Sequence, residues 1–145
     1  MKEGFLNTVG TVSDASGDAG RKVYEAFFDT VELLLTHHIT LVVEAAFQHK
    51  LWVPKLEPLR EITRIRIIFC TIEEELARSR RIERSRSDPN REQFHSDDMV
   101  QADREGHSLP IADYDPPHLN LPMLTVDTSD GYQPGFETIV SFACA

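Results

Sequence analysis

The spacing of apolar residues along the first half of the chain predicts helices that alternate with short strands. Apolar side chains recur every three or four residues over Val23–Leu35, which predicts an amphipathic helix packed against a core. After a turn at residues 36–38, the run Ile39–Val43 is almost wholly apolar and rich in β-branched residues, as is typical of a strand buried on both faces. Residues 48–60 contain two prolines, so we expect any helix there to be short or kinked.

A second strand and a charged helix are predicted in the middle of the chain. Residues Ile65–Cys70 alternate and then run apolar, which favours a buried strand with Cys70 as one of its buried side chains. Thr71 and Glu74 have the spacing of a capping box, which predicts a helix over residues 72–86. That helix is so rich in charge that most of its surface should be solvated or face a polar cleft.

The last third of the chain completes the pattern with a loop, a strand and a helix. Residues 87–117 are loop-like, Met123–Val126 predicts a third strand, and Phe136–Ala143 predicts a closing helix entered through Pro134. Alternating helices and strands predict an α/β protein with a parallel sheet. Ligands bind at the carboxyl ends of such strands, so the positions of interest are 44–47, 71–74 and 127–132.

Length and composition are those of one soluble globular domain. The chain has 145 residues, of which 41% are hydrophobic and 27% charged. Its longest apolar stretch is far shorter than the roughly 20 residues that span a bilayer, and its first residues lack the pattern of a signal peptide. Two cysteines form neither a disulfide framework nor a zinc-binding spacing. We therefore expect a cytoplasmic protein with no membrane partner.

The charge is unevenly distributed along the chain. A formal net charge of −9 argues against a nucleic-acid partner, because such binding needs a cationic surface. Six of the eleven arginines nevertheless lie within residues 78–91, whereas residues 97–130 contain eight acidic residues and Arg104 alone. The sequence thus predicts an arginine-rich segment over 72–98, able to meet an anion, and an acidic loop over 99–120.

Two groups of side chains are candidates for chemistry. Glu44 ends the first predicted strand, where a carboxylate could hold Mg²⁺ or orient a nucleophile, although a helix-capping carboxylate fits the position equally well. The arginines of residues 78–91 could grip phosphate oxygens, with His95 as a further donor. The alternative is a solvated helix in which Glu73–Glu75 and Glu83 pair with the arginines three and four residues away.

A phosphate-cradling loop is missing from these residues. Such a loop reads G-x-x-x-x-G-K-[ST] and follows a strand. The nearest segment, Gly17–Val23, has the wrong glycine spacing, ends in valine instead of a hydroxyl residue, and has no predicted strand before it. The sequence therefore provides no loop that would wrap a β-phosphate.

Five segments of the chain form a pattern when taken together, namely Tyr24–Leu35, Ile39–Phe47, Ile65–Cys70, Arg78–Asp97 and Leu124–Tyr132. In their order and spacing these segments resemble predicted P-loop kinases of the AAA_33 type. Those kinases are small ATP-binding proteins related to the chloramphenicol phosphotransferase, zeta toxin and gluconate kinase groups. The resemblance implies a three-layer parallel sheet of the P-loop kinase type. The first two strands and the P-loop of that fold have no counterpart here, so residues 1–145 would form a single incomplete domain.

The resemblance also implies a function and a set of site residues. Complete family members transfer the γ-phosphoryl group of ATP, with Mg²⁺, to a hydroxyl group of a small-molecule substrate. We expect this chain to be weakly active or inactive, and the alternative is a non-catalytic binding or assembly module that uses the arginine-rich helix. The implied catalytic residues are Glu44, Arg84 and Arg91, and Glu44 would also bind Mg²⁺. The lid arginines Arg81, Arg84 and Arg91 would contact the ATP phosphates, with His95 nearby. Asp127, Thr128 and Ser129 would lie near the adenine.

The missing first strand would leave a gap in the sheet. In the family fold that strand lies between the strands that correspond to Ile39–Val43 and Ile65–Cys70, so two buried edges would lack ladder partners. We therefore expect these two strands either to pair directly or to mediate self-association.

Overall fold

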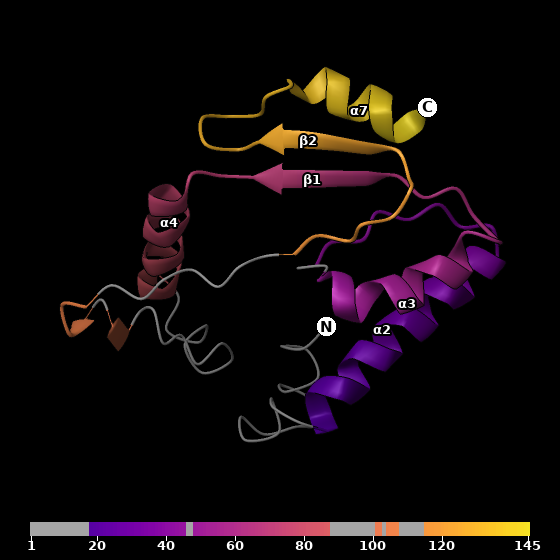
Figure 1. Ribbon diagram of the computed structural model, residues 1–145, viewed down its shortest axis with the longest axis horizontal. Helices are drawn as coiled ribbons and strands as arrows, with labels where there is room; N and C mark the ends of the chain where they lie inside the picture. The colour runs from indigo at the N-terminus through magenta and orange to yellow at the C-terminus, as the bar shows by residue number, and fades with distance from the viewer. Residues whose placement is uncertain (1–17, 46–47, 88–100, 103, 108–114) are drawn as a thin grey trace. The chain divides into compact units, whose positions relative to one another are not determined.

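The computed structural model of the chain describes residues 18–45, 48–87, 101–102, 104–107 and 115–145, with only the backbone for residues 18–20. The chain divides into two compact units, one of residues 1–44 and 82–108 and the other of residues 45–81 and 109–145. The named elements are α2 (Asp18–Thr36), α3 (His49–Leu59), β1 (Ile67–Thr71), α4 (Glu74–Ser87), β2 (Met123–Asp127) and α7 (Phe136–Cys144) (Figure 1).

The first unit contains α2, the amphipathic helix that the sequence predicts. Phe28 and Val31 are three residues apart on one face of this helix, and both are buried. The rings of Tyr24 and Phe27 meet the ring of Phe28 edge to face, with centroid distances of 5.2 and 5.4 Å. This arrangement is favourable for aromatic rings, so the buried stripe of α2 is a small aromatic cluster.

A left-handed residue at the predicted turn ends α2. This residue is His38, which has φ of 59°. The N–H of His38 donates to the carbonyl oxygen of Leu35 at 2.9 Å, and the N–H of Ile39 donates to the carbonyl oxygen of Leu34 at 3.0 Å. These two bonds form the Schellman motif, which satisfies carbonyl groups that the last turn of a helix would otherwise leave open. The chain therefore leaves the helix axis immediately before Ile39.

The prediction of a buried strand at Ile39–Val43 is wrong. The structure places these residues outside any strand, and the side chain of Val42 is 95% exposed. Strand propensity reflects the packing and pairing that a neighbouring strand provides, so a β-branched run by itself does not make a strand. This run and the strand near residue 67 belong to different compact units, so their direct pairing stays a prediction, as does self-association.

The second unit contains α3, in which the two prolines do not prevent a helix. The helix continues through Pro54 and ends one residue after Pro58. Leu56 and Leu59, three residues apart, are both buried, so the helix presents an apolar face in spite of the backbone donors lost at proline.

Two parallel strands form the sheet of the described residues, as the sequence predicts for this part of the chain. β1 pairs with β2 in a register that places Ile67 opposite Met123 and Thr71 opposite Asp127. Val126 in β2 is 1% exposed and is the most deeply buried large side chain among the described residues. Cys70, expected to be buried, is exposed, because β1 alternates between half-buried and exposed side chains.

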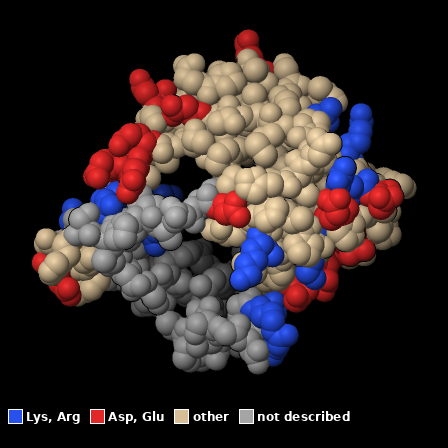
Figure 2. Space-filling model, viewed as in Figure 1, with Lys and Arg blue, Asp and Glu red and all other residues tan. Residues whose placement is uncertain are grey.

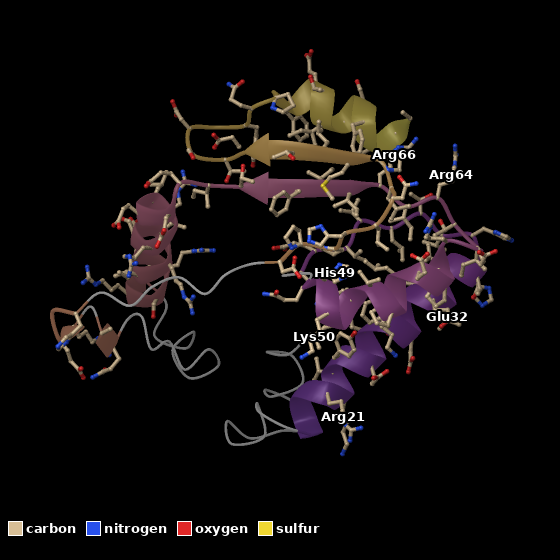
Figure 3. The ribbon with its side chains drawn as sticks, viewed as in Figure 1. Arg21, Glu32, His49, Lys50, Arg64 and Arg66 are labelled. Carbon is tan, nitrogen blue, oxygen red and sulfur yellow. The ribbon has the colours of Figure 1, made fainter. Side chains whose placement is uncertain are left out.

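The two helices that follow the strands also agree with the prediction. Two residues separate the end of β1 from the beginning of α4, which lies on the connection from β1 to β2, while α7 follows β2 after a turn. The Arg66 guanidinium, just before β1, donates to the carbonyl oxygen of Ala145, just after α7 (Figure 3). This contact ties the end of α7 to the beginning of the sheet. Of the helices that the structure describes, none has the length and apolar character needed to cross a membrane.

Candidate functional site

The carboxyl ends of β1 and β2 lie next to each other, and the residues that follow them are joined by hydrogen bonds. Thr128 donates to the carbonyl oxygen of Thr71 through both its backbone N–H, at 2.8 Å, and its hydroxyl, at 2.9 Å. The hydroxyl of Thr71 in turn donates to the carbonyl oxygen of Val126 at 3.4 Å. We call the residues joined here the strand-end cluster, namely Thr71, Glu73, Arg80, Asp127, Thr128 and Ser129.

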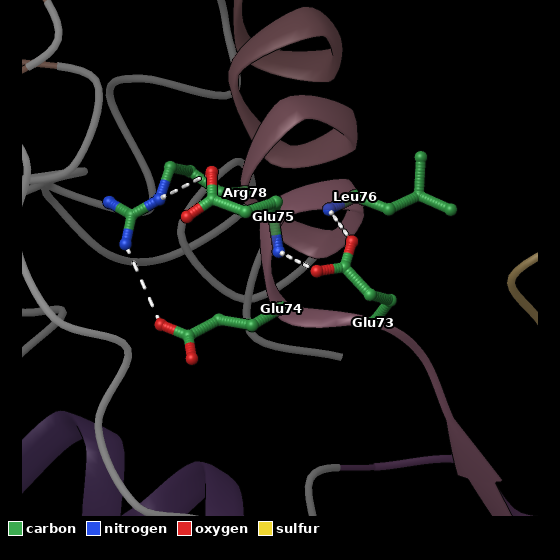
Figure 4. A network of polar contacts seen from close by, with 5 residues as sticks. All are labelled: Glu73, Glu74, Glu75, Leu76 and Arg78. Atoms are coloured by element: carbon green, nitrogen blue, oxygen red, sulfur yellow. Dashed lines mark hydrogen bonds and ion pairs between the residues drawn. The ribbon is translucent and has the colours of Figure 1, made fainter.

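Glu73 caps the beginning of α4 in this cluster. Its carboxylate oxygens accept the backbone N–H groups of Glu75, at 3.2 Å, and Leu76, at 2.9 Å (Figure 4). The N–H of Glu73 itself donates to the hydroxyl oxygen of Ser129 at 3.2 Å. The predicted capping box of Thr71 and Glu74 is therefore wrong. Thr71 is the last residue of β1, and its hydroxyl donates to the neighbouring strand instead of capping α4. Glu73, directly before the first helical residue, is the N-cap.

Arg80 connects the second turn of α4 to the loop after β2. Its two terminal nitrogens donate to the carbonyl oxygens of Thr128 and Ser129, both at 2.9 Å in a partly buried setting. A guanidinium group suits this task because its planar fork can serve two acceptors at once. The sequence shows Arg80 only as one member of the arginine-rich segment. No local signal distinguishes it, since its partners are 48 and 49 residues away.

Asp127 begins the tight loop that carries the acceptors of Arg80. Its Oδ1 atom accepts the backbone N–H of Ser129 at 2.8 Å, while its backbone exchanges two hydrogen bonds with Gln133. Gly131, inside this loop, has φ of 75°, which side-chain-bearing residues adopt less readily. Hydrogen bonds from the Ser129 hydroxyl and then the Ser129 N–H hold the pKa of Asp127 below its ordinary value, with a smaller opposing effect of burial.

The lowered pKa of Asp127 predicts a pH dependence of stability. The folded chain favours the charged carboxylate, so its contribution is present above the unfolded-state pKa of 3.8 and is lost as the pH falls through the lower folded-state pKa. We expect Asp127→Asn, whose amide oxygen can still accept the Ser129 N–H, to be less stable than the parent at pH 7. This difference should shrink below about pH 4. Thermal unfolding of both proteins from pH 3 to 7 measures it, and a constant difference across that range would contradict the assignment.

The charges of α4 are partly balanced within the helix itself. Arg78 lies 3.7 Å from a carboxylate oxygen of Glu74 and 4.0 Å from one of Glu75, and its side chain is only 16% exposed (Figure 4). These are the pairs that the alternative of a solvated helix predicts. Figure 2 accordingly shows both acidic and basic side chains on the described surface. Arg81 and Arg84, three residues apart on the same helix, are exposed.

The structure brings together only some of the predicted site residues. Asp127, Thr128 and Ser129 lie in the strand-end cluster, and the predicted positions 71–74 and 127–132 do meet at the strand ends. Glu44 is exposed and follows a segment that is not a strand, so the expectation that it ends a strand is wrong. Arg91 and His95 lie outside the described residues. Within the described ranges, no group of three or more histidine, cysteine or acidic side chains could hold a metal ion.

Comparison with known proteins identifies no relative. No family model matches the chain, and neither do curated proteins or solved structures. The described residues form a two-stranded parallel sheet with α4 after one strand and α7 after the other.

Proposed function

We propose that the chain is an ATP-binding protein of the P-loop small-molecule kinase type. One observation supports this proposal above the others. The carboxyl ends of two parallel strands, which is where ligands of α/β proteins bind, carry an ordered polar loop directly beside the arginine-rich helix α4.

Side chains of α4 and of the strand ends each suit a nucleotide in part. Arg81 and Arg84 are exposed cations of α4 that can meet phosphate oxygens, and Asp127 and Thr128, at the strand ends, offer oxygens to a base. The first N–H groups of α4 do not add a phosphate site, because the Glu73 carboxylate accepts two of them. Phosphate binding would thus depend on arginine side chains rather than on the helix terminus.

Three further roles belong to the proposal through the resemblance. Glu44 would bind Mg²⁺, and Arg91 and His95 would contact phosphate beside Arg84. The magnesium ion, when bound, would neutralise charge on the triphosphate. The residues present contain no G-x-x-x-x-G-K-[ST] loop, and phosphoryl transfer relies chiefly on positioning and electrostatic stabilisation of the phosphates. We therefore expect this chain to bind ATP with Mg²⁺ but to turn it over slowly or not at all.

Calorimetric titration of the chain with ATP and Mg²⁺ tests the proposal. An arginine that donates to phosphate contributes about 1.5–3 kcal/mol, so we expect Arg84→Ala to weaken binding about tenfold or more. Arg60→Ala is the matched control, because Arg60 is also exposed and lies directly after α3, where it pairs with Glu57 of that helix. Absence of binding, or equal binding by the parent and Arg84→Ala, would overturn the proposal. ATP turnover that Arg84→Ala abolishes would overturn the expectation of little catalysis.

The second candidate is a non-catalytic binding or assembly module. It is favoured by the ion pairs and hydrogen bonds that two arginines of α4 make within the chain. Arg78 pairs with two glutamates and Arg80 with two backbone carbonyl groups, so these cations act in part as structural groups. Exposed arginines on the same helix would then pair with acidic side chains of a partner or of a second copy. Salt-sensitive association without nucleotide, together with no heat of ATP binding, is the result that selects this alternative.

A further inference from the structure

A set of histidine contacts fastens the beginning of α3 to the segment that leads toward β2. The N–H of His49 donates to the carbonyl oxygen of Asp115 at 2.8 Å, and the N–H of His118 donates to Nδ1 of His49 at 2.9 Å. A weaker contact of 3.5 Å joins the N–H of Asp115 to the side-chain oxygen of Gln48. We call these four residues, Gln48, His49, Asp115 and His118, the histidine clasp. Figure 3 shows His49 at the beginning of α3.

The hydrogen bond to His49 requires a neutral imidazole. A backbone N–H can only donate, so Nδ1 of His49 must carry a lone pair and the proton of the neutral ring must be on Nε2. Protonation of Nδ1 would replace this acceptor with a second donor that faces the His118 N–H. It would also place a positive charge at the first residue of α3, where the helix dipole disfavours cations.

The surrounding charges make the two histidines of the clasp respond to protonation in opposite ways. Nε2 of His118 lies 2.7 Å from a carboxylate oxygen of Asp115, so a protonated His118 keeps its partner and gains an ion pair. The carboxylate of Asp115 is thereby directed to His118 rather than to His49. The rings of the two histidines are 5.0 Å apart, and the nearest basic neighbour along α3 is Lys50. A positive charge on His49 would therefore lie beside the His118 ring, which is itself a cation when protonated, and no carboxylate of the described residues is bonded to the His49 ring.

From this geometry we propose that the histidine clasp is a pH-sensitive contact. It is closed while His49 is neutral and accepts the His118 N–H, and protonation of His49 opens it by removing that hydrogen bond. Imidazole side chains ordinarily change charge between pH 5 and 8. Opening removes the hydrogen bond from the His118 N–H to the His49 side chain. The backbone bond from His49 to Asp115 and the contact between Asp115 and Gln48 remain possible. The segment that leads to β2 would then exchange with solvent more readily at acidic pH.

The amide of His118 reports directly on the clasp. We expect its hydrogen-exchange protection, corrected for the intrinsic effect of pH, to fall severalfold, up to about tenfold, between pH 8 and pH 5.5. This is the size of effect expected for the loss of one net hydrogen bond. His49→Asn provides an acceptor in the place of Nδ1 that does not titrate, so this variant should keep its protection over the whole range. His49→Ala should lack the protection at every pH.

Two further variants make the result specific to His49. His118→Asn retains the backbone donor and the neutral His49 ring, so its amide should still lose protection as the pH falls. His37→Asn removes an exposed histidine after α2 that lies outside the clasp, and it should behave like the parent. Protection that does not change with pH in the parent, or that falls equally in the parent and in His49→Asn, would overturn the proposal.

Discussion

Arg80→Ala is expected to lower the free energy of unfolding by about 2–4 kcal/mol. The substitution removes two hydrogen bonds from a charged donor, each worth about 1.5–3 kcal/mol, although water can partly replace the guanidinium in this partly buried setting. It also leaves the carbonyl groups of Thr128 and Ser129 without this donor. Urea unfolding followed by the fluorescence of Trp52, the single tryptophan and a residue of the same unit, measures the loss.

Two variants distinguish this effect from a general loss of positive charge. Arg86→Ala removes an exposed arginine near the end of the same helix and should change stability by no more than about 0.5 kcal/mol. Arg80→Lys should lie between the parent and Arg80→Ala, because an ammonium group lacks the planar fork that spans two carbonyl oxygens. Equal losses in Arg80→Ala and Arg86→Ala would show that the bonds to the loop do not stabilise the fold.

Phe28→Ala is expected to lower the free energy of unfolding by about 3–5 kcal/mol. The side chain is 5% exposed, and its ring contacts two neighbouring aromatic rings edge to face. The substitution removes the buried ring and its contacts with the two neighbouring rings, and it leaves a cavity that the helix cannot easily fill. Thermal unfolding followed by far-ultraviolet circular dichroism, which reports the helix content of the chain and so includes α2, measures the change.

Leu33→Ala is the matched control on the same helix. Leu33 is 58% exposed, so its truncation should cost no more than about 1 kcal/mol. Leucine and alanine are also close in helix propensity, so the comparison isolates burial. A loss at Phe28 no larger than that at Leu33 would contradict the assignment of Phe28 to the core.

The regular elements could be predicted from the sequence because each has a local cause. The apolar period of α2, the short apolar runs of β1 and β2, and the entry to α7 after proline are all properties of neighbouring residues. The parallel pairing of the two strands also follows, since a helix lies between them. The same reasoning selected residues 71–74 and 127–132, which the structure does bring to one edge.

The roles of particular side chains at that edge could not be predicted in the same way. Glu73 caps α4, and Arg80 and Ser129 join the helix to a loop some fifty residues further along. Each contact depends on how the end of one strand faces the end of another, and this information is absent from residue spacing. The exposure of Cys70 has a similar origin, because a strand has two faces and only the packing around it decides whether both are covered.

By itself, then, the sequence determined where most helices and strands lie and that the strands pair in parallel, because backbone preference and apolar periodicity act over a few residues. Only the tertiary structure decided that Ile39–Val43 does not form a strand and that Arg80 donates hydrogen bonds to the loop after β2. The same holds for the hydrogen bond that His49 accepts from His118. Pairing, burial and hydrogen bonding between distant residues require partners that only the folded chain brings within reach.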